Sequence, residues 1–267
     1  MALGELLDAA FTLMKERPRA VLGVTALFVL PTQLLASFVQ RDLVATASFT
    51  EIFNDPSLAG SSSTGSSANA GVVFLVGLLP SMALPFIAGA LGRLAAAWRA
   101  GGDMATGAAL RAAGRKWWVL LVAWLLTHLA EGAAVLAFVF PALLLMALWQ
   151  AAAPAIVVED LGPIQGLRRS GRLAGTRFWP TVLAVLAAWF VHYVLSAMLP
   201  LVFQLVGLAL GSSGGWVVLA IGTTVTSLVT TAFLAAFAVE LYLDLRVRSE
   251  GLDLQLEADQ HFAGAPQ

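Results

Sequence analysis

Three ionisable side chains lie inside long apolar segments of this sequence, and they are the residues best able to do chemistry. His128 and Glu131 are three residues apart, and so share one helical face, in the apolar segment that begins at Trp117. With a rise of about 1.5 Å per residue, His128 lies about 16–17 Å into that helix, and His192 lies about 20 Å beyond Trp179. Ionisable groups are costly to place in hydrocarbon, so such residues are functional candidates.

Because their depths are similar, we expect His128, Glu131 and His192 to converge. A converged cluster could relay protons, bind a polar substrate or bind a metal ion. The order His128-Leu-Ala-Glu131 differs from the two-histidine spacing of zinc peptidases, so we expect no metallopeptidase, no metal and no other cofactor. The structural alternative is an interhelical hydrogen bond worth about 1 kcal/mol. The residues alone leave both interpretations open.

Other catalytic patterns are weak in this sequence. The run Gly211-Ser-Ser-Gly214 lies in a short loop, and no histidine follows it in the last apolar segment to act as a base, so we expect a tight turn there. The sequence has no cysteine, no phosphate-binding glycine loop and no nucleic-acid-binding module. We therefore predict a protein that is not an enzyme and binds no nucleic acid.

The composition requires an apolar solvent around most of the chain. Hydrophobic residues make up 59% of the 267 residues, charged residues make up 12%, and the mean hydropathy is +0.85. A soluble domain has about 45–50% apolar and about 25% charged residues. A single soluble core of this size could not bury such an excess of apolar side chains, so the sequence predicts a membrane protein.

Six segments are long and apolar enough to cross about 30 Å of hydrocarbon. They cover residues 20–39, 70–94, 117–138, 141–158, 178–208 and 216–243. We predict an all-α membrane protein with a six-helix transmembrane bundle, in which residues 1–250 form a single transmembrane domain and residues 251–267 form a cytoplasmic tail. Every lysine and arginine except Arg41 falls at the same ends of these spans, which predicts that this face and both termini are cytoplasmic.

A short amphipathic segment precedes each of three pairs of spans, near residues 3–15, 106–111 and 160–172. We expect Thr106 to cap the second of these helices and Asp160 to cap the third, with Pro163 in its first turn. Such segments suit the membrane interface, with their apolar faces in the acyl boundary and their arginines near anionic headgroups. Three copies of this helix and hairpin would form a threefold internal repeat. The predicted headgroup-binding residues are Arg168, Arg169, Arg172 and Arg177.

The last span carries two further groups of polar residues. Several threonines and a serine between Thr223 and Thr231 form a hydroxyl-rich stripe, for which close packing against a neighbouring helix is favoured over an aqueous path. Glu240 and Asp244 lie near the cytoplasmic end, where Arg246 and Arg248 are expected to neutralise them.

Three stretches of the chain resemble a known family. They are Leu3-Gly-Glu-Leu-Leu-Asp-Ala-Ala-Phe11, the stretch from Ala153 through Glu159-Asp-Leu-Gly-Pro-Ile-Gln-Gly-Leu-Arg-Arg-Ser170 to Trp179, and Leu241-Tyr-Leu-Asp-Leu-Arg-Val-Arg-Ser-Glu-Gly-Leu-Asp-Leu254. Together they are similar to the glycerophosphoryl diester phosphodiesterase membrane-domain family of uncharacterised bacterial proteins. The resemblance implies a six-helix architecture and a bacterial cytoplasmic (inner) membrane. It does not imply phosphodiesterase activity, because that chemistry belongs to a separate soluble barrel for which this chain leaves no room.

The leading functional prediction is a non-enzymatic membrane protein that acts as a lipid-associated scaffold or partner subunit. Its expected partners are membrane lipids, anionic ones in particular, and another membrane protein. The alternative is a transporter or permease for a lipid or small amphiphile, with a mid-membrane polar site at His128, Glu131 and His192.

Overall fold

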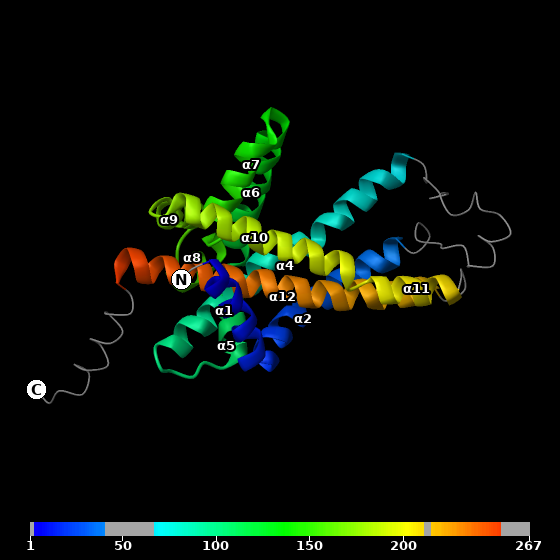
Figure 1. Cartoon of the computed structure of the whole chain (residues 1–267), viewed down its shortest axis with the longest axis horizontal. Coiled ribbons are helices and arrows are strands. Elements are labelled where there is room, and N and C mark those ends of the chain that lie inside the picture. The colour runs from blue at the N-terminus through cyan, green and yellow to red at the C-terminus, as the bar shows by residue number, and fades with distance from the viewer. Residues whose placement is uncertain (1–2, 41–66, 211–214, 252–267) are drawn as a thin grey trace, which may run out of the picture. The chain divides into compact units, whose positions relative to one another are not determined.

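The computed structural model describes residues 3–40, 67–210 and 215–251, and all the regular structure in these ranges is helical (Figure 1). The helices are α1 (Leu3–Glu16), α2 (Pro18–Gln40), α4 (Ser67–Arg99), α5 (Thr106–Arg115), α6 (Trp117–Ala137), α7 (Val139–Trp149), α8 (Ala152–Val158), α9 (Pro163–Gly175), α10 (Phe178–Met198), α11 (Leu201–Leu210) and α12 (Gly215–Glu250). Arg41, the predicted turn at residues 211–214 and the tail beyond Gly251 lie outside the described residues.

Six helical stretches in the described part of the chain are long and apolar enough to cross a membrane. They are Pro18–Ala36, Leu78–Arg99, Trp117–Ala137, Val139–Val158, Phe178–Leu210 and Val217–Glu250. Each overlaps one of the predicted spans. The all-α fold class is therefore confirmed, and the chain is a multi-pass membrane protein.

Two of the spanning stretches are interrupted, and proline explains each break. The fourth divides into α7 and α8 around Gln150. Pro154 lacks the backbone N–H that would otherwise bond to the carbonyl of Gln150, so the helix loses a bond at this point. The fifth divides into α10 and α11 at Leu199 and Pro200, for the same reason.

The helices divide into two compact units. The first unit comprises Met1–Val24, Pro85–Phe190 and Phe233–Gln267, and the second comprises Thr25–Leu84 and Val191–Ala232. Each boundary falls inside a helix, namely α2, α4, α10 or α12. The single transmembrane domain stays a prediction.

The core of the first unit forms around the second half of α12. Phe233, Phe237 and Tyr242 are fully buried there, and the Phe11 ring of α1 stacks on Phe233 with ring centroids 4.7 Å apart. Fully buried residues of α4, including Leu91, belong to the same core. Residues 232–239 of α12 are all apolar and all buried, as expected for a helix surrounded by other helices.

Glycines let two helices approach α8 closely. A Cβ atom on Gly89 of α4 would lie 2.6 Å from Cγ2 of Val157, and one on Gly166 of α9 would lie 2.2 Å from Cγ1 of Ile156. Small residues at helix contacts permit this kind of packing in membrane proteins. The short helix α8 is therefore held on two sides, by α4 and by α9.

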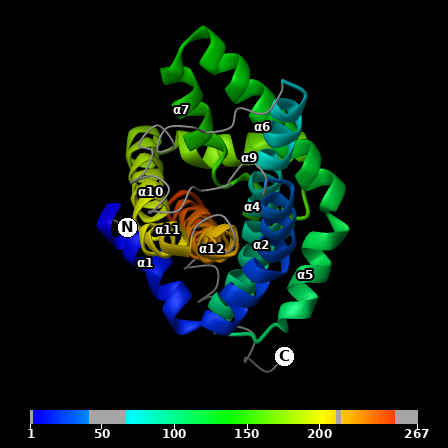
Figure 2. The same cartoon turned by 90° about the vertical axis from the view of Figure 1, so that its right-hand side faces the viewer.

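The three predicted amphipathic helices are present as α1, α5 and α9, each preceding a pair of spanning stretches (Figure 2). Their apolar faces were expected to contact the acyl chains of the membrane, but they pack largely on protein. Leu6 and Leu13 of α1 are buried, as are Leu167 and Leu173 of α9. The ends of the neighbouring spans supply the apolar surface that the acyl chains were expected to supply. Ile164 remains 56% exposed.

The second unit is held by close helix packing. Nε2 of Gln33 on α2 donates a hydrogen bond to Oγ of Ser227 on α12. A Cβ atom on Gly222 would lie 2.4 Å from Cβ of Phe203, so α11 approaches α12 at this glycine. Thr224 and Thr230 donate their hydroxyl protons to carbonyls of their own helix, at 2.7 and 2.9 Å. These contacts favour the packing interpretation of the hydroxyl-rich stripe.

Candidate functional site

Arg169 on α9 joins two acidic residues that are far apart in the sequence. Its Nε donates to Oε1 and Oε2 of Glu159, at 3.0 and 2.7 Å. Its Nη2 donates to Oε2 of Glu250 at 2.8 Å, and its Nη1 donates to Oε1 of the same carboxylate. All of these bonds are charge-assisted; those to Glu250 use two donors and two acceptors, the strongest arrangement that an arginine offers to a carboxylate, whereas those to Glu159 share one N–H group. The hydrogen bonds that Arg169 donates to Glu250, followed by those that it donates to Glu159, raise the pKa of its guanidinium above the ordinary value.

The same cluster includes Tyr242 and Arg246 of α12. The Tyr242 hydroxyl donates to Oε1 of Glu159 at 2.8 Å, and Nε of Arg246 donates to Oε2 of Glu250 at 3.2 Å. The cluster thus contains two arginines and two glutamates, whose formal charges cancel. It connects two of the stretches that carry the family resemblance, the one around Glu159 and Arg169 and the one that begins at Leu241. We call these five residues the Arg169 cluster.

The Arg169 cluster holds α9 in an orientation in which the helix face that carries Arg168 and Arg172 points outward. Arg168 and Arg172 are exposed and form no ion pair with any described residue. The opposite face is buried, and there the Ser170 hydroxyl donates to the carbonyl of Leu148 at 2.6 Å. The amphipathic helix therefore presents two uncompensated positive charges from a rigid support.

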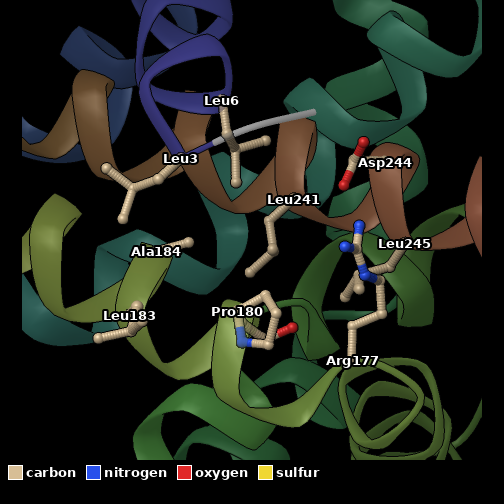
Figure 3. A pocket seen from close by; sticks show the side chains of 10 residues that line it. Leu3, Leu6, Arg177, Pro180, Leu183, Ala184, Leu241, Asp244 and Leu245 are labelled. Carbon is tan, nitrogen blue, oxygen red and sulfur yellow. The ribbon is translucent and has the colours of Figure 1, made fainter.

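An open, mostly apolar groove of about 260 Å³ lies beside this region, within the first unit (Figure 3). Its lining comes from α1, α10, α12 and the residue before α10: Leu3, Leu6, Arg177, Pro180, Thr181, Leu183, Ala184, Leu241, Asp244 and Leu245. Figure 3 shows the Arg177 and Asp244 side chains at the same end of the groove. Asp244 accepts two hydrogen bonds from Nε of Arg248, at 3.0 and 3.1 Å, whereas exposed Arg177 forms no ion pair within the described residues.

The four arginines predicted to bind headgroups thus divide into two kinds. Arg168, Arg172 and Arg177 are exposed, as contact with a headgroup requires. Arg169 has a side chain that is only 16% exposed, and its donors are directed at two carboxylates. The structure gives Arg169 a supporting role in place of the predicted one, because two acidic side chains meet it from other helices.

The turn between α8 and α9 also differs from the expectation. Asp160 does not cap α9; the N-cap is Gly162, whose N–H donates to Oε1 of Gln165 at 3.0 Å. Asp160 instead adopts a positive φ of 57° just after α8, and the N–H of Leu161 bonds back to the carbonyl of Ile156, as in a Schellman motif. Ala105, without a side-chain cap, likewise takes the position before α5 in which Thr106 was expected.

Basic side chains close the end of α8. Nη1 of Arg93 donates to the carbonyl of Val158 at 3.1 Å, and Nζ of Lys116 donates to that of Asp160 at 3.0 Å. Lys116 also pairs with the Asp160 carboxylate at 2.7 Å, and this hydrogen bond and charge hold the pKa of Asp160 below its ordinary value. Cations near the last carbonyls of a helix are stabilising.

The acidic residues of α12 find partners only partly as predicted. Asp244 pairs with Arg248, four residues away, as expected. Glu240 pairs instead with Arg99 of α4, and its side chain is only 5% exposed. Glu240 is close in sequence to basic residues of its own helix, but its side chain pairs with a residue of α4, the helix that packs against it.

The residues of the predicted mid-membrane site lie in different units. His128 and Glu131 belong to the first unit and His192 to the second, so their convergence stays a prediction. His128 is exposed, and its Nδ1 lies 2.9 Å from the carbonyl of Trp124 on its own helix. Glu131 is half-buried, and half-buried His192 lies close to the backbone of Thr230. Among the described residues, no group of three His, Cys, Asp or Glu side chains could hold a metal ion.

Several members of the Arg169 cluster were not singled out from the sequence. Glu159 and Glu250 lie at helix ends rich in charge, where a solvated carboxylate is the ordinary expectation, and Tyr242 lies inside α12, where a buried aromatic side chain is ordinary. The one available signal was that Glu159 and Glu250 fall inside two stretches carrying the same family resemblance.

Comparison with known proteins adds one match. Residues 129–245 match a family described as a domain of unknown function (DUF7847). The matched part runs from α6 into α12 and includes Glu159, Arg169 and Tyr242 of the Arg169 cluster. No curated protein and no solved structure gives a significant match to this chain.

Proposed function

We propose that this protein is a non-enzymatic, lipid-associated membrane scaffold that binds anionic phospholipid through Arg168, Arg172 and Arg177. The observation that carries the proposal is the contrast between Arg169, held by two carboxylates, and exposed Arg168 and Arg172, which form no ion pair with a described residue. A basic residue near an anionic membrane surface contributes about 1 kcal/mol to the attraction. A helix that is already held in place supports binding, because its backbone does not have to be ordered when the lipid binds.

The groove supplies a place for the apolar part of the same lipid. Its volume of about 260 Å³ lies just below the range of about 300–1,000 Å³ found for drug-sized ligands, so it suits part of one acyl chain. Arg177 at one end would pair with the lipid phosphate. Leu183, which is 58% exposed, would contact the chain together with Leu3 of α1.

The proposed location is the cytoplasmic (inner) membrane of a bacterium, with both termini and the arginine-bearing α9 on the cytoplasmic side. Two observations support this orientation: basic residues gather at one set of span ends, and Trp117, Trp118 and Trp179 beside them are 55–60% exposed. Basic loops stay cytoplasmic, and tryptophans favour the headgroup level. The resemblance to the phosphodiesterase membrane-domain family is a further proposal consistent with this location.

The test measures how much phosphatidylglycerol the protein retains in nanodiscs of mixed phosphatidylglycerol and phosphatidylcholine. The variant carries Arg168→Gln, Arg172→Gln and Arg177→Gln. A matched control removes the same charge at exposed positions elsewhere, through Arg19→Gln, Arg111→Gln and Arg115→Gln. We expect retention to fall about fivefold for each arginine removed from the proposed site, to fall less in the control, and to weaken at high salt.

Two results would reject the proposal. Equal loss in both variants would mean that total charge, not this site, attracts the lipid. Unchanged retention in the first variant would mean that these arginines do not bind it. The transporter alternative stays a prediction, because it needs His128 and Glu131 to converge with His192, and none of the contacts described above joins them.

A further inference from the structure

Helix α6, the first helix of a hairpin with α7, is the least buried of the six spanning stretches in the described residues. Figures 1 and 2 both show these two helices side by side, and Phe138 joins them in an extended conformation. Only 11% of the α6 spanning stretch is buried, against 22–50% for the other five stretches. Lipid can cover an apolar face of this kind, but it cannot satisfy ionisable groups on that face.

The exposed face of α6 carries one such group, His128, and a second, half-buried Glu131, lies next to it. Leu125, His128, Gly132 and Val135 follow a spacing of i, i+3, i+7 and i+10, which is the spacing of a seam between two helices, and all four are exposed. Glu131 borders this seam. Ionisable residues in spanning helices almost always face other protein or water, because exposure to hydrocarbon is costly.

His128 lies too deep in the membrane for its side chain to reach the headgroup region. Measured from Trp117 at about 1.5 Å per residue, His128 lies about 16 Å and Glu131 about 21 Å into a hydrocarbon layer of about 30 Å. His128 is therefore near mid-depth, beyond the reach of either headgroup layer. Because Nδ1 of His128 is bonded to the carbonyl of Trp124, the second ring nitrogen, Nε2, is the atom that requires a hydrogen-bonding partner from protein.

We propose that the occupant of this face is a second copy of the same chain, bound through α6 about a two-fold axis normal to the membrane. The face is complementary to itself, because Nε2 of His128 can share a hydrogen bond with the Glu131 carboxyl group of the other copy, and symmetry repeats that bond. Two-fold interfaces bring the same patch of both subunits together in this way.

Gly132 permits the approach that such a contact needs. Nothing lies within 4 Å of the position that its Cβ would occupy, so the backbone is open at this point of the seam. A small residue at a crossing point lets two spanning helices pack closely. Leu125 and Val135 would then pack against their equivalents above and below the polar contact.

The test uses single cysteines, since the chain has none of its own. Leu125→Cys and Val135→Cys are oxidised in membranes containing the full chain, with Phe190→Cys of α10 as the matched control. Val135 is 52% exposed and Phe190 is 67% exposed, so accessibility to the oxidant is similar or greater in the control. We expect disulfide-linked dimers at the two α6 positions and few at Phe190.

A second measurement examines the polar contact. Single-molecule photobleaching in liposomes at low protein-to-lipid ratio should give two-step traces for the wild type. Replacing Glu131 with leucine removes two symmetric hydrogen bonds and should weaken the dimer about tenfold. Photobleaching in single steps at every ratio would overturn the proposal. So would equal cross-linking at Phe190, or cross-linking of the α6 cysteines to a different protein with no dimer of this chain.

Discussion

Replacing Arg169 with alanine tests whether the Arg169 cluster holds α9 in place. The guanidinium makes four hydrogen bonds, two to Glu159 and two to Glu250. Its removal leaves the cluster with one arginine and two carboxylates, and hence with a net negative charge. Tyr242 would still donate to Glu159, and Arg246 would still pair with Glu250.

The expected magnitude follows from these contacts. Removing one partner of a buried ion pair costs about 3–5 kcal/mol. The side chains here are 16–29% exposed, and Arg246 remains, so water and the second arginine recover part of that energy. We expect the free energy of unfolding to fall by about 2–3 kcal/mol, which corresponds to a decrease in Tm of about 5–10 °C for a chain of this size.

The assay is thermal unfolding of the detergent-solubilised protein, followed by the fluorescence of its eight tryptophans. Arg172→Ala is the control on the same helix, because Arg172 is exposed and pairs with no described residue; its effect should stay within about 0.5 kcal/mol. The double variant Arg169→Ala with Glu250→Ala should lose less than the sum of the two single changes. If Arg169→Ala and Arg172→Ala unfold at the same temperature, the reasoning about the cluster is refuted.

Three further predictions concern packing, pH and topology. Gly166→Ala should destabilise the protein by about 1–3 kcal/mol because its Cβ would overlap a neighbouring side chain, whereas Gly171→Ala on the same helix, where the space is open, should be neutral or slightly stabilising in the same unfolding assay. The pKa of Asp160 is held low by its lysine partner, so the Tm difference between wild type and Asp160→Asn should be present at neutral pH and be lost as the pH falls through that lowered pKa, which lies below the ordinary value of about 4; a difference that persists at the lowest pH at which the protein stays folded would contradict the ion pair. Single cysteines in place of Arg111 and Arg168 should react with a membrane-impermeant reagent only after the cytoplasmic side is opened, and opposite behaviour of the two would overturn the proposed orientation.

The spans could be predicted from the sequence because crossing a membrane is a local requirement. About 20 consecutive apolar residues suffice for each span, whatever the other helices do. The three short amphipathic helices were predictable for the same reason, for example from the spacing of Leu6 and Phe11 in the first and of Ile164 and Leu167 in the third against charged neighbours. The sequence did not predict which surface covers their apolar faces, because that depends on which ends of the spans lie beside each helix.

The capping predictions show where local rules stop. Asp160 is a good N-cap residue by type and position, yet it follows α8 with a positive φ because Lys116 and the end of α8 meet it there. Glu240 is near Arg246 and Arg248 in sequence, yet Arg99 of another helix binds it. In both cases a residue from elsewhere in the chain offered the stronger contact.

The sequence by itself determined that apolar segments cross a membrane and that positive charge gathers at one set of their ends, because hydropathy and charge belong to the residues in a segment. Only the tertiary structure decided which of those charges are cancelled. Arg169 meets a glutamate 81 residues away, while Arg168 beside it remains uncompensated. Ion pairing depends on the distance between side chains in space, and that distance is fixed by the packing of α8, α9 and α12.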